Sequence, residues 1–174
     1  HGVTSVVMGN CGFTIAPCRE ADAGFVFKNL ERAEDISPDA MKAGINWSWE
    51  TFPEFLDTID ALPKGINYAG YIGHSALRTY VMGERAFEEQ ATADELKRMC
   101  EIAKEAVDAG AIGFSTSRTP NHVTADDLPV ASRIADWDEV RAIVNAVGET
   151  GRGIFEIAGE QVGRDPARIR EYHE

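Results

Sequence analysis

Residues 2–12 have the sequence GVTSVVMGNCG, in which an apolar run leads into a cysteine flanked by small, turn-forming residues. The run 3–8 ends at a glycine, which predicts a short buried strand. Gly9 and Gly12 allow the backbone to turn sharply and to approach a ligand closely. Cys11 therefore stands at the end of a strand. Its residue type leaves four roles open: a buried core thiol, a disulfide partner, a nucleophile or a metal ligand.

Three further segments are short, apolar and bounded by glycine or turn residues, which also predicts buried strands. They are residues 68–73, 111–114 and 153–157. Apolar residues recur at helical spacing between the strands, and three of these helices begin with a capping residue followed three positions later by glutamate. The expected helices cover residues 51–62, 92–109 and 136–148, and a last helix begins near Asp165.

The alternation of strands and helices predicts a parallel sheet covered by helices. Two α/β architectures fit this order: an open doubly wound sheet and part of a (β/α)8 barrel. A complete barrel needs about 250 residues, so a chain of 174 residues holds only part of one. The pattern alone does not choose between them. The connection 12–50 is long and has little apolar periodicity, and long loops after strands usually carry function.

Composition argues against several classes of protein. The formal net charge of −12 disfavours binding to nucleic acid and to anionic membrane surfaces, because like charges repel. No apolar run reaches the roughly 18 residues that span a bilayer, and no signal peptide is visible. The 3 cysteines are too few for a disulfide framework, so we expect a cytoplasmic protein. The chain opens on His1 without a methionine, which indicates a segment of a longer protein.

The sequence YIGHSALR places His74 at the carboxyl end of the second predicted strand, where ligands gather in parallel α/β folds. If a helix begins here, Arg78 lies one turn away, and the two side chains together would bind a carboxylate. The alternative is structural. In that case Ser75 caps the helix, and His74 forms a hydrogen bond beneath it.

The sequence GFSTSRTPNH follows the third predicted strand and places Ser115, Ser117, Arg118 and His122 on a loop. Serine, threonine and asparagine are also ordinary turn residues. The chain has no Gly-x-Ser-x-Gly elbow, so a serine nucleophile is not expected. It also lacks the glycine-rich phosphate-binding motifs, which argues against a nucleotide site.

Five stretches together resemble the N-acyl-D-amino-acid deacylase (D-aminoacylase) family, which belongs to the amidohydrolase superfamily of metal-dependent (β/α)8-barrel hydrolases. They are HGVTSVVMGNCGFTIAPCRE, GINWSWETFPEFLD, GHSALRTYVMGERA, ATADELKRM and EAVDAGAIGFSTSRT, and the resemblance extends from residue 1 to about residue 153. The motifs are specific in combination. The resemblance implies a partial (β/α)8 barrel of amidohydrolase type, with residues 1–174 forming a segment of the metal-dependent hydrolase domain.

The resemblance implies a zinc-dependent hydrolase that cleaves the amide bond of N-acyl-D-amino acids or of related N-acyl compounds. Cys11 matches the zinc ligand in the family's GNCG motif, and hydroxide on the zinc would attack the amide carbonyl. The small-molecule substrate would lie among the loops at the carboxyl ends of the strands. The residues expected to contact it are Asn10, His74, Ser75, Arg78, Arg118 and His122.

Three parts of the family's site have no counterpart in this chain. The His-x-His pair would precede His1, the catalytic aspartate would follow Glu174, and the fourth predicted strand carries Glu156 but no histidine. Whether Glu156 binds the metal stays open. The segment alone is expected to be inactive, and its two unpaired sheet edges invite self-association. The alternative hypothesis is a non-catalytic α/β domain that binds a small molecule and buries Cys11 in its core.

Overall fold

The computed structural model describes residues 1–159, so the helix expected near Asp165 lies outside the described residues. The described chain forms a 4-stranded parallel sheet with the strand order β1-β2-β3-β4. Its strands are β1 (Ser5–Met8), β2 (Asn67–Gly73), β3 (Gly113–Ser117) and β4 (Ile154–Ala158). All four predicted strands are confirmed, with boundaries that differ by a few residues.

The helices predicted within the described residues are also confirmed. They are α3 (Phe52–Ala61), α5 (Ala93–Ala109) and α7 (Trp137–Gly148). Thr51 and Thr92 each close a capping box with the glutamate three residues later. The Asp136 carboxylate accepts a hydrogen bond from the backbone N–H of Glu139, with 2.8 Å between the two heavy atoms. The local capping signals therefore set where these helices begin.

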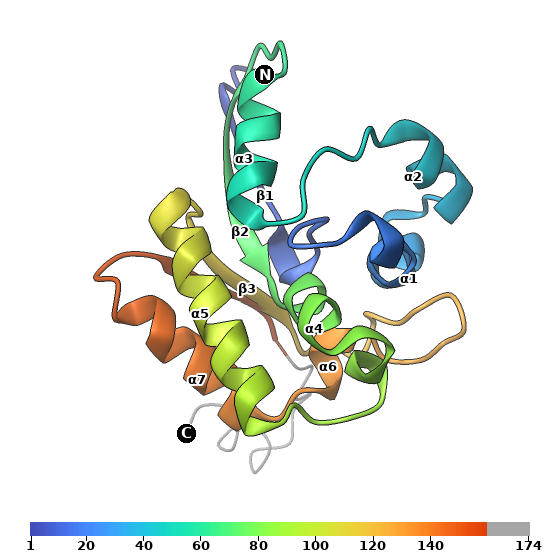
Figure 1. The fold of residues 1–174 in the computed structure, drawn as a ribbon. Helices are drawn as coiled ribbons and strands as arrows, with labels where there is room; N and C mark the ends of the chain where they lie inside the picture. Colours follow the sequence, from blue (N-terminus) through green and yellow to red (C-terminus); the bar gives the residue numbers. More distant parts are fainter. Residues whose placement is uncertain (160–174) are drawn as a thin grey trace.

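The strand order distinguishes the two architectures that the sequence leaves open. Each strand pairs with the strand before it in the chain, and every pairing is parallel. Strand–helix–strand connections are right-handed. When each new strand is added at the same edge of the sheet, all the connecting helices therefore lie on one face. Figure 1 shows this arrangement, with α3, α5 and α7 on the same side of the strands. A doubly wound sheet reverses its strand order instead, so the fold is a curled half-barrel with flanking helices.

The connection 12–50 is not the irregular loop that its weak periodicity predicted. It contains η2 (Glu20–Asp22), α1 (Ala23–Glu34) and α2 (Pro38–Gly44). Val26, Phe27 and Leu30 of α1 pack in a small cluster of their own with Cys18, separate from the main core. A helix that packs against such a local cluster needs only a few apolar residues, so its sequence shows no long stripe.

Three further short elements are α4 (His74–Met82), η3 (Gly83–Phe87) and α6 (Ala131–Ile134). α4 begins directly at His74, so the condition for placing Arg78 one turn later is met. The main core lies between the sheet and the helices and includes Ile72, Phe114 and Met99. Within residues 1–159 the structure has no helix long and apolar enough to cross a membrane.

β3 begins two residues later and ends three residues later than predicted, and this corrects the position of two serines. Ser115 and Ser117 lie within the strand and not on the loop expected for them. Parallel pairing with β4 continues to the partners Ser117 and Ala158, which holds this segment extended. Arg118 and His122 do follow the strand, as predicted.

The outer strands are not buried, contrary to the prediction. Val7 of β1 is 43% exposed and Phe155 of β4 is 40% exposed, whereas Ile72 and Phe114 of the inner strands are fully buried. β1 and β4 are the edge strands, and each has a partner on one side only within the described residues. Apolar composition identified these segments as strands, but burial depends on a second neighbour.

Candidate metal and substrate site

Cys11 lies in a tight turn at the carboxyl end of β1. The turn forms the 3-10 element η1 (Asn10–Gly12), and the φ angles of Gly9, Cys11 and Gly12 are 84°, 58° and 78°. Glycine adopts such angles easily, whereas an L-residue in the left-handed region costs about 1–2 kcal/mol. A Cβ atom on Gly9 would lie 2.8 Å from the carbonyl oxygen of Tyr71, so the turn packs closely against β2.

Side chains from β3 and β4 hold this turn in place. The backbone N–H of Gly12 donates a hydrogen bond to the Ser115 hydroxyl, with 3.0 Å between N and Oγ. The same hydroxyl donates to the carbonyl of Gly9. The backbone N–H of Cys11 donates to the Glu156 carboxylate, with 2.7 Å between N and Oε2. The Cys11 turn therefore spans the carboxyl ends of all four strands.

The Cys11 thiol lies in a partly buried and negatively charged environment. Burial raises its pKa, and the carboxylates of Glu156 and Glu34 raise it further. Such a thiol stays protonated near neutral pH, which argues against a nucleophile that acts without assistance. Cys11, Cys18 and Cys100 are all free, so the disulfide alternative is wrong for this structure. The surrounding carboxylates would attract a cation instead.

Cys11 and Glu156 bring one sulfur and one carboxylate to the same edge of the sheet. Both donor types bind zinc. Among residues 1–159, no three histidine, cysteine, aspartate or glutamate side chains come together in a group that would hold a metal ion. The described residues therefore form no complete metal site, although a thiol and a carboxylate are donor types that zinc accepts.

His74 and Arg78 bind a carboxylate of the protein itself, that of Glu139 in α7, and not the substrate carboxylate for which their spacing was interpreted. His74 Nε2 lies 2.8 Å from Glu139 Oε1, and Arg78 Nη1 lies 2.6 Å from the same oxygen. His74 Nδ1 also lies 2.7 Å from the hydroxyl of Thr116. Both His74 and Arg78 are fully buried. Both imidazole nitrogens of His74 and the terminal nitrogens of Arg78 bind protein groups, whereas the buried Arg78 Nε has no hydrogen-bond partner among the described residues.

Burial decides the protonation states in this network. It lowers the pKa of His74 more than the neighbouring Glu139 raises it, so the imidazole is neutral. Burial also acts to raise the pKa of Glu139, but His74 and Arg78 outweigh it and lower that pKa. The ionised carboxylate can only accept, so His74 donates from Nε2 and Thr116 donates to Nδ1. The Arg78 charge balances the Glu139 charge.

Ser75 is buried beside this network. Its hydroxyl accepts a hydrogen bond from the backbone N–H of Ser132 in α6, with 3.2 Å between the heavy atoms. Ser75 forms no side-chain cap for α4 in the structure. The cap expected in the structural alternative is therefore wrong, and Ser75 instead joins α4 to α6.

Sequence reasoning did not assign Glu139 to the site. The prediction used it only as the third residue of a capping pattern, and the structure makes it the centre of the buried network. One signal was present. Glu139 lies four residues before Ile143 and one before Val140, on the apolar face of its helix, where both neighbours are buried. A carboxylate on such a face requires a partner when it is buried.

Arg118 and His122 follow β3, and His122 packs against Phe13, which directly follows the Cys11 turn. His122 Nδ1 lies 2.5 Å from the Ser117 hydroxyl, and its ring lies 4.8 Å from the ring of Phe13 between centroids. Burial lowers the pKa of His122, and the charge of Arg133 lowers it further, so the imidazole is neutral near pH 7. The Arg118 guanidinium lies 5.1 Å from the ring centroid of Trp137.

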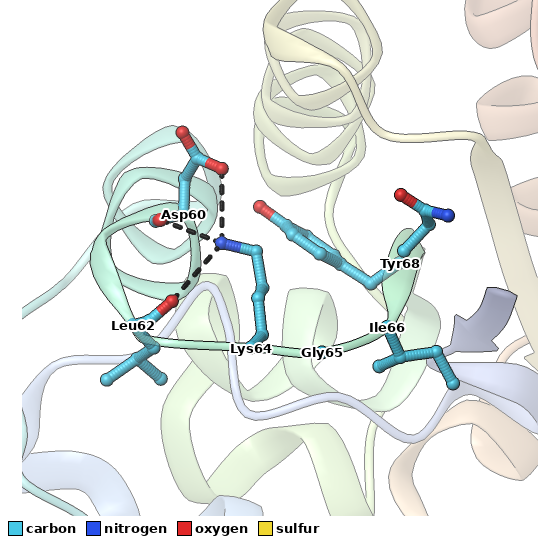
Figure 2. Close-up of a pocket in the computed structure, with 7 residues that line it drawn as sticks. Asp60, Leu62, Lys64, Gly65, Ile66 and Tyr68 are labelled. Carbon is cyan, nitrogen blue, oxygen red and sulfur yellow. Dashed lines mark hydrogen bonds and ion pairs between the residues drawn. The ribbon is translucent and has the colours of Figure 1, made fainter. Parts of the chain in front are cut away.

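The depression in Figure 2 is at the opposite end of β2 and is separate from the Cys11 turn. Its lining residues are Asp60, Leu62, Lys64, Gly65, Ile66, Asn67 and Tyr68. Lys64 Nζ donates to the carbonyl oxygen of Asp60 at 2.7 Å, and its charge lies 5.4 Å from the Tyr68 ring. Lys64 thus binds the carboxyl end of α3, which gives the depression a structural explanation.

The sequence profile of the Amidohydrolase family matches residues 1–174. This chain belongs to the amidohydrolase family. D-aminoacylase of Alcaligenes xylosoxydans xylosoxydans is 38% identical over 117 residues, which cover 67% of this chain and 21% of that enzyme. An uncharacterised protein of Mycobacterium tuberculosis is 32% identical over 160 residues, which cover 87% of this chain and 26% of the relative.

Solved structures agree with this family. A crystal structure of D-aminoacylase has a TM-score of 0.66 and 27% identity, covering 98% of this amidohydrolase chain and 31% of its own. N-acyl-D-glutamate deacylase from Bordetella bronchiseptica, complexed with zinc and a phosphonate inhibitor, has a TM-score of 0.65 and 25% identity over 90% of this chain and 28% of its own. The chain thus spans a third or less of these relatives. The predicted family and the partial barrel fold are confirmed.

Proposed function

We propose that this chain is part of a zinc-dependent amidohydrolase domain that hydrolyses the amide bond of N-acyl-D-amino acids. Two observations support the substrate class: the identity to D-aminoacylase and the structural similarity to N-acyl-D-glutamate deacylase. That deacylase is complexed with zinc, and a D-aminoacylase mutant was determined with copper chloride. A small N-acyl compound is therefore the proposed substrate, and zinc is the proposed metal.

The geometry of the Cys11 turn carries the proposal. The turn places a thiol and the Glu156 carboxylate at the carboxyl edge of the sheet, where barrel enzymes bind their ligands. Cys11 would hold the metal there as a thiolate. When bound, zinc supplies Lewis acidity toward an amide carbonyl and lowers the pKa of coordinated water.

The predicted substrate residues fall into two groups. Arg118, His122 and Asn10 belong to segments that follow strands at this edge, and we propose that they contact the substrate. The Ser117 hydroxyl would fix the His122 ring through Nδ1 and leave Nε2 to face the acyl compound. His74, Ser75 and Arg78 are fully buried and bound to protein groups. Because these three side chains are buried, we propose that they support the pocket from beneath and do not contact the substrate directly.

The experiment compares native full-length protein with Cys11→Ala. We expect the native protein to release free amine from N-acetyl-D-amino acids faster than from the L-enantiomers. Cys11→Ala should lower bound zinc and activity together, because a catalytic zinc site has only about three protein ligands. Zinc is measured by elemental analysis, and amine release by derivatisation of the product.

Cys100→Ala is the matched control, since Cys100 is a partly buried free cysteine on the distant helix α5. It should keep both zinc and activity. Native zinc content with full activity in Cys11→Ala would overturn the role of Cys11. A metal-free, well-folded full-length protein without amidase activity would instead favour a non-catalytic binding domain.

We further propose a cytoplasmic protein without nucleic-acid or membrane partners. The net charge of −12 and the three free cysteines support this proposal. The open edges of β1 and β4 support self-association of the isolated segment.

A further inference from the structure

One hydroxyl and one carboxylate hold the turn that carries Cys11. The Ser115 hydroxyl accepts from the N–H of Gly12 and donates to the carbonyl of Gly9, so it closes the turn across Cys11. The Glu156 carboxylate accepts the N–H of Cys11 itself. In the described part of the chain, no other side chain forms a hydrogen bond with the backbone of residues 9–12.

We propose that Ser115 and Glu156 are positioning residues that fix the direction of the Cys11 thiol toward the metal. The inference rests on the proposed function, in which Cys11 is a zinc ligand. The family resemblance leads one to expect a histidine on this strand, where the chain has Glu156. Glu156 instead acts through the backbone amide of Cys11. Neither residue needs to touch the metal for this role.

The turn needs such support because its backbone conformation is unfavourable. Cys11 has a φ of 58°, which an L-residue adopts rarely. Without the two anchors the peptide would relax toward a common conformation, and the thiol would point elsewhere. Outer-shell hydrogen bonds orient metal ligands in the same way in many metal sites.

Ser115 is suited to this task because its strand is rigid. It is fully buried in β3, which pairs with β2 on one side and with β4 on the other. The next residue, Thr116, is bound to His74, and His74 is bound to Glu139. The buried network therefore fixes the strand from which Ser115 reaches the Cys11 turn.

The first test uses Ser115→Ala in the full-length protein. Zinc affinity, measured by competition with a chelator, should fall about tenfold to a hundredfold. Alkylation of Cys11 in the metal-free protein should change in rate, because the thiol no longer has a fixed environment. Peptide mass spectrometry reads this rate, with Cys100 in the same molecule as the internal reference.

Ser132→Ala is the matched control. Ser132 is equally buried, and its hydroxyl donates to the carbonyl of Ser117, away from residues 9–12. Ser132→Ala loses one side-chain hydrogen bond and Ser115→Ala loses two, so both variants lose some stability. Only Ser115→Ala should alter zinc affinity and the Cys11 alkylation rate, and native values of both quantities in that variant would overturn the role of Ser115.

Glu156→Gln tests how Glu156 acts. The amide oxygen of glutamine still accepts the Cys11 N–H, but it is a poor zinc ligand. The inference predicts that Glu156→Gln keeps most of the zinc affinity, whereas Glu156→Ala loses it. An equal loss in both variants would make Glu156 a metal ligand and overturn its positioning role.

Cys11→Ala separates failure of this inference from failure of the proposed function. If Cys11→Ala binds zinc as tightly as the native protein, the proposed ligand is wrong, and the alkylation rates still decide the positioning role. If Cys11→Ala loses zinc but Ser115→Ala retains native affinity and alkylation, only the positioning role fails. Cobalt substitution adds a direct signature, since the thiolate-to-cobalt charge-transfer band should weaken in Ser115→Ala.

Discussion

Glu139 lies on the buried face of α7, and it binds two side chains that the sequence assigned to the substrate. Its carboxylate accepts from His74 and from Arg78, and both of these residues are fully buried. Arg78 also donates to the carbonyl oxygen of Glu89 at 2.7 Å. At the residue scale, the network joins α4 to α7 across β3.

Glu139→Ala should lower the free energy of unfolding of the full-length protein by about 3–5 kcal/mol, because it leaves the Arg78 charge buried without a partner. Urea unfolding measures the loss. Asp138→Ala is the control, since its carboxylate is 83% exposed and pairs with Arg141 at the surface. That variant should change stability by no more than about 0.5 kcal/mol. Equal losses in the two variants would contradict the prediction.

Glu139 also predicts how stability depends on pH. Its pKa is lowered in the folded state because His74 and Arg78 outweigh the effect of burial. A lowered pKa means that, as the pH falls, the Glu139 carboxylate takes up a proton in the unfolded state before it does so in the folded state. The stabilisation from the ionised Glu139 is therefore complete well above the unfolded pKa of about 4.3, and it is lost as the pH falls through the folded pKa. Glu139→Gln should therefore be less stable at pH 7 and show a weaker acid dependence.

The helices of the half-barrel follow local rules. α5 begins at a capping box of Thr92 and Glu95, and Gly110 follows its last residue with a φ of 125°. The pKa of Glu95 is lowered chiefly by the hydrogen bond that its carboxylate accepts from the Thr92 backbone, which is part of this capping box. At the element scale, hydrogen bonds within a few residues determine where α5 starts and ends.

Thr92→Ala should lower the free energy of unfolding by about 1 kcal/mol, because it removes the side chain that caps the first turn. Thermal unfolding of the full-length protein measures this change. Lys97→Ala, at an exposed position inside the same helix, should leave stability within about 0.5 kcal/mol of native. An unchanged midpoint in Thr92→Ala would show that the cap contributes nothing.

The whole described chain is a sheet with helices on one face and two open edges. Val3, Val7, Ile154 and Phe155 on or beside the outer strands are each at least 40% exposed. Apolar surface of this kind on unpaired strands favours pairing with another chain. In Figure 1, β1 lies at one margin of the sheet, away from β3.

The isolated 174-residue chain is therefore expected to self-associate. Sedimentation velocity should show dimers or larger species that increase with concentration. Val7→Lys places a charge on the edge strand β1 and should shift the distribution toward monomer. A stable monomer of the unsubstituted chain at high concentration would contradict this prediction.

The sequence by itself determined the strands, the capped helices and the position of Cys11 at a strand end, because apolar periodicity and capping act within one turn or one strand. It also identified the spacing of His74 and Arg78, which suits a carboxylate. The burial predicted for β1 and β4 was wrong, since burial depends on neighbouring strands and not on composition.

Only the tertiary structure decided which groups meet. Glu139 is 65 residues from His74 along the chain, and Ser115 is 103 residues from Gly12. No local pattern encodes such a pair, because each pair exists only once the strand order of the curled sheet brings the turn after β1 to β3 and β4, and α7 to α4. That order made the half-barrel, gave His74 and Arg78 a partner within the protein, and brought Ser115 and Glu156 to the turn that carries Cys11.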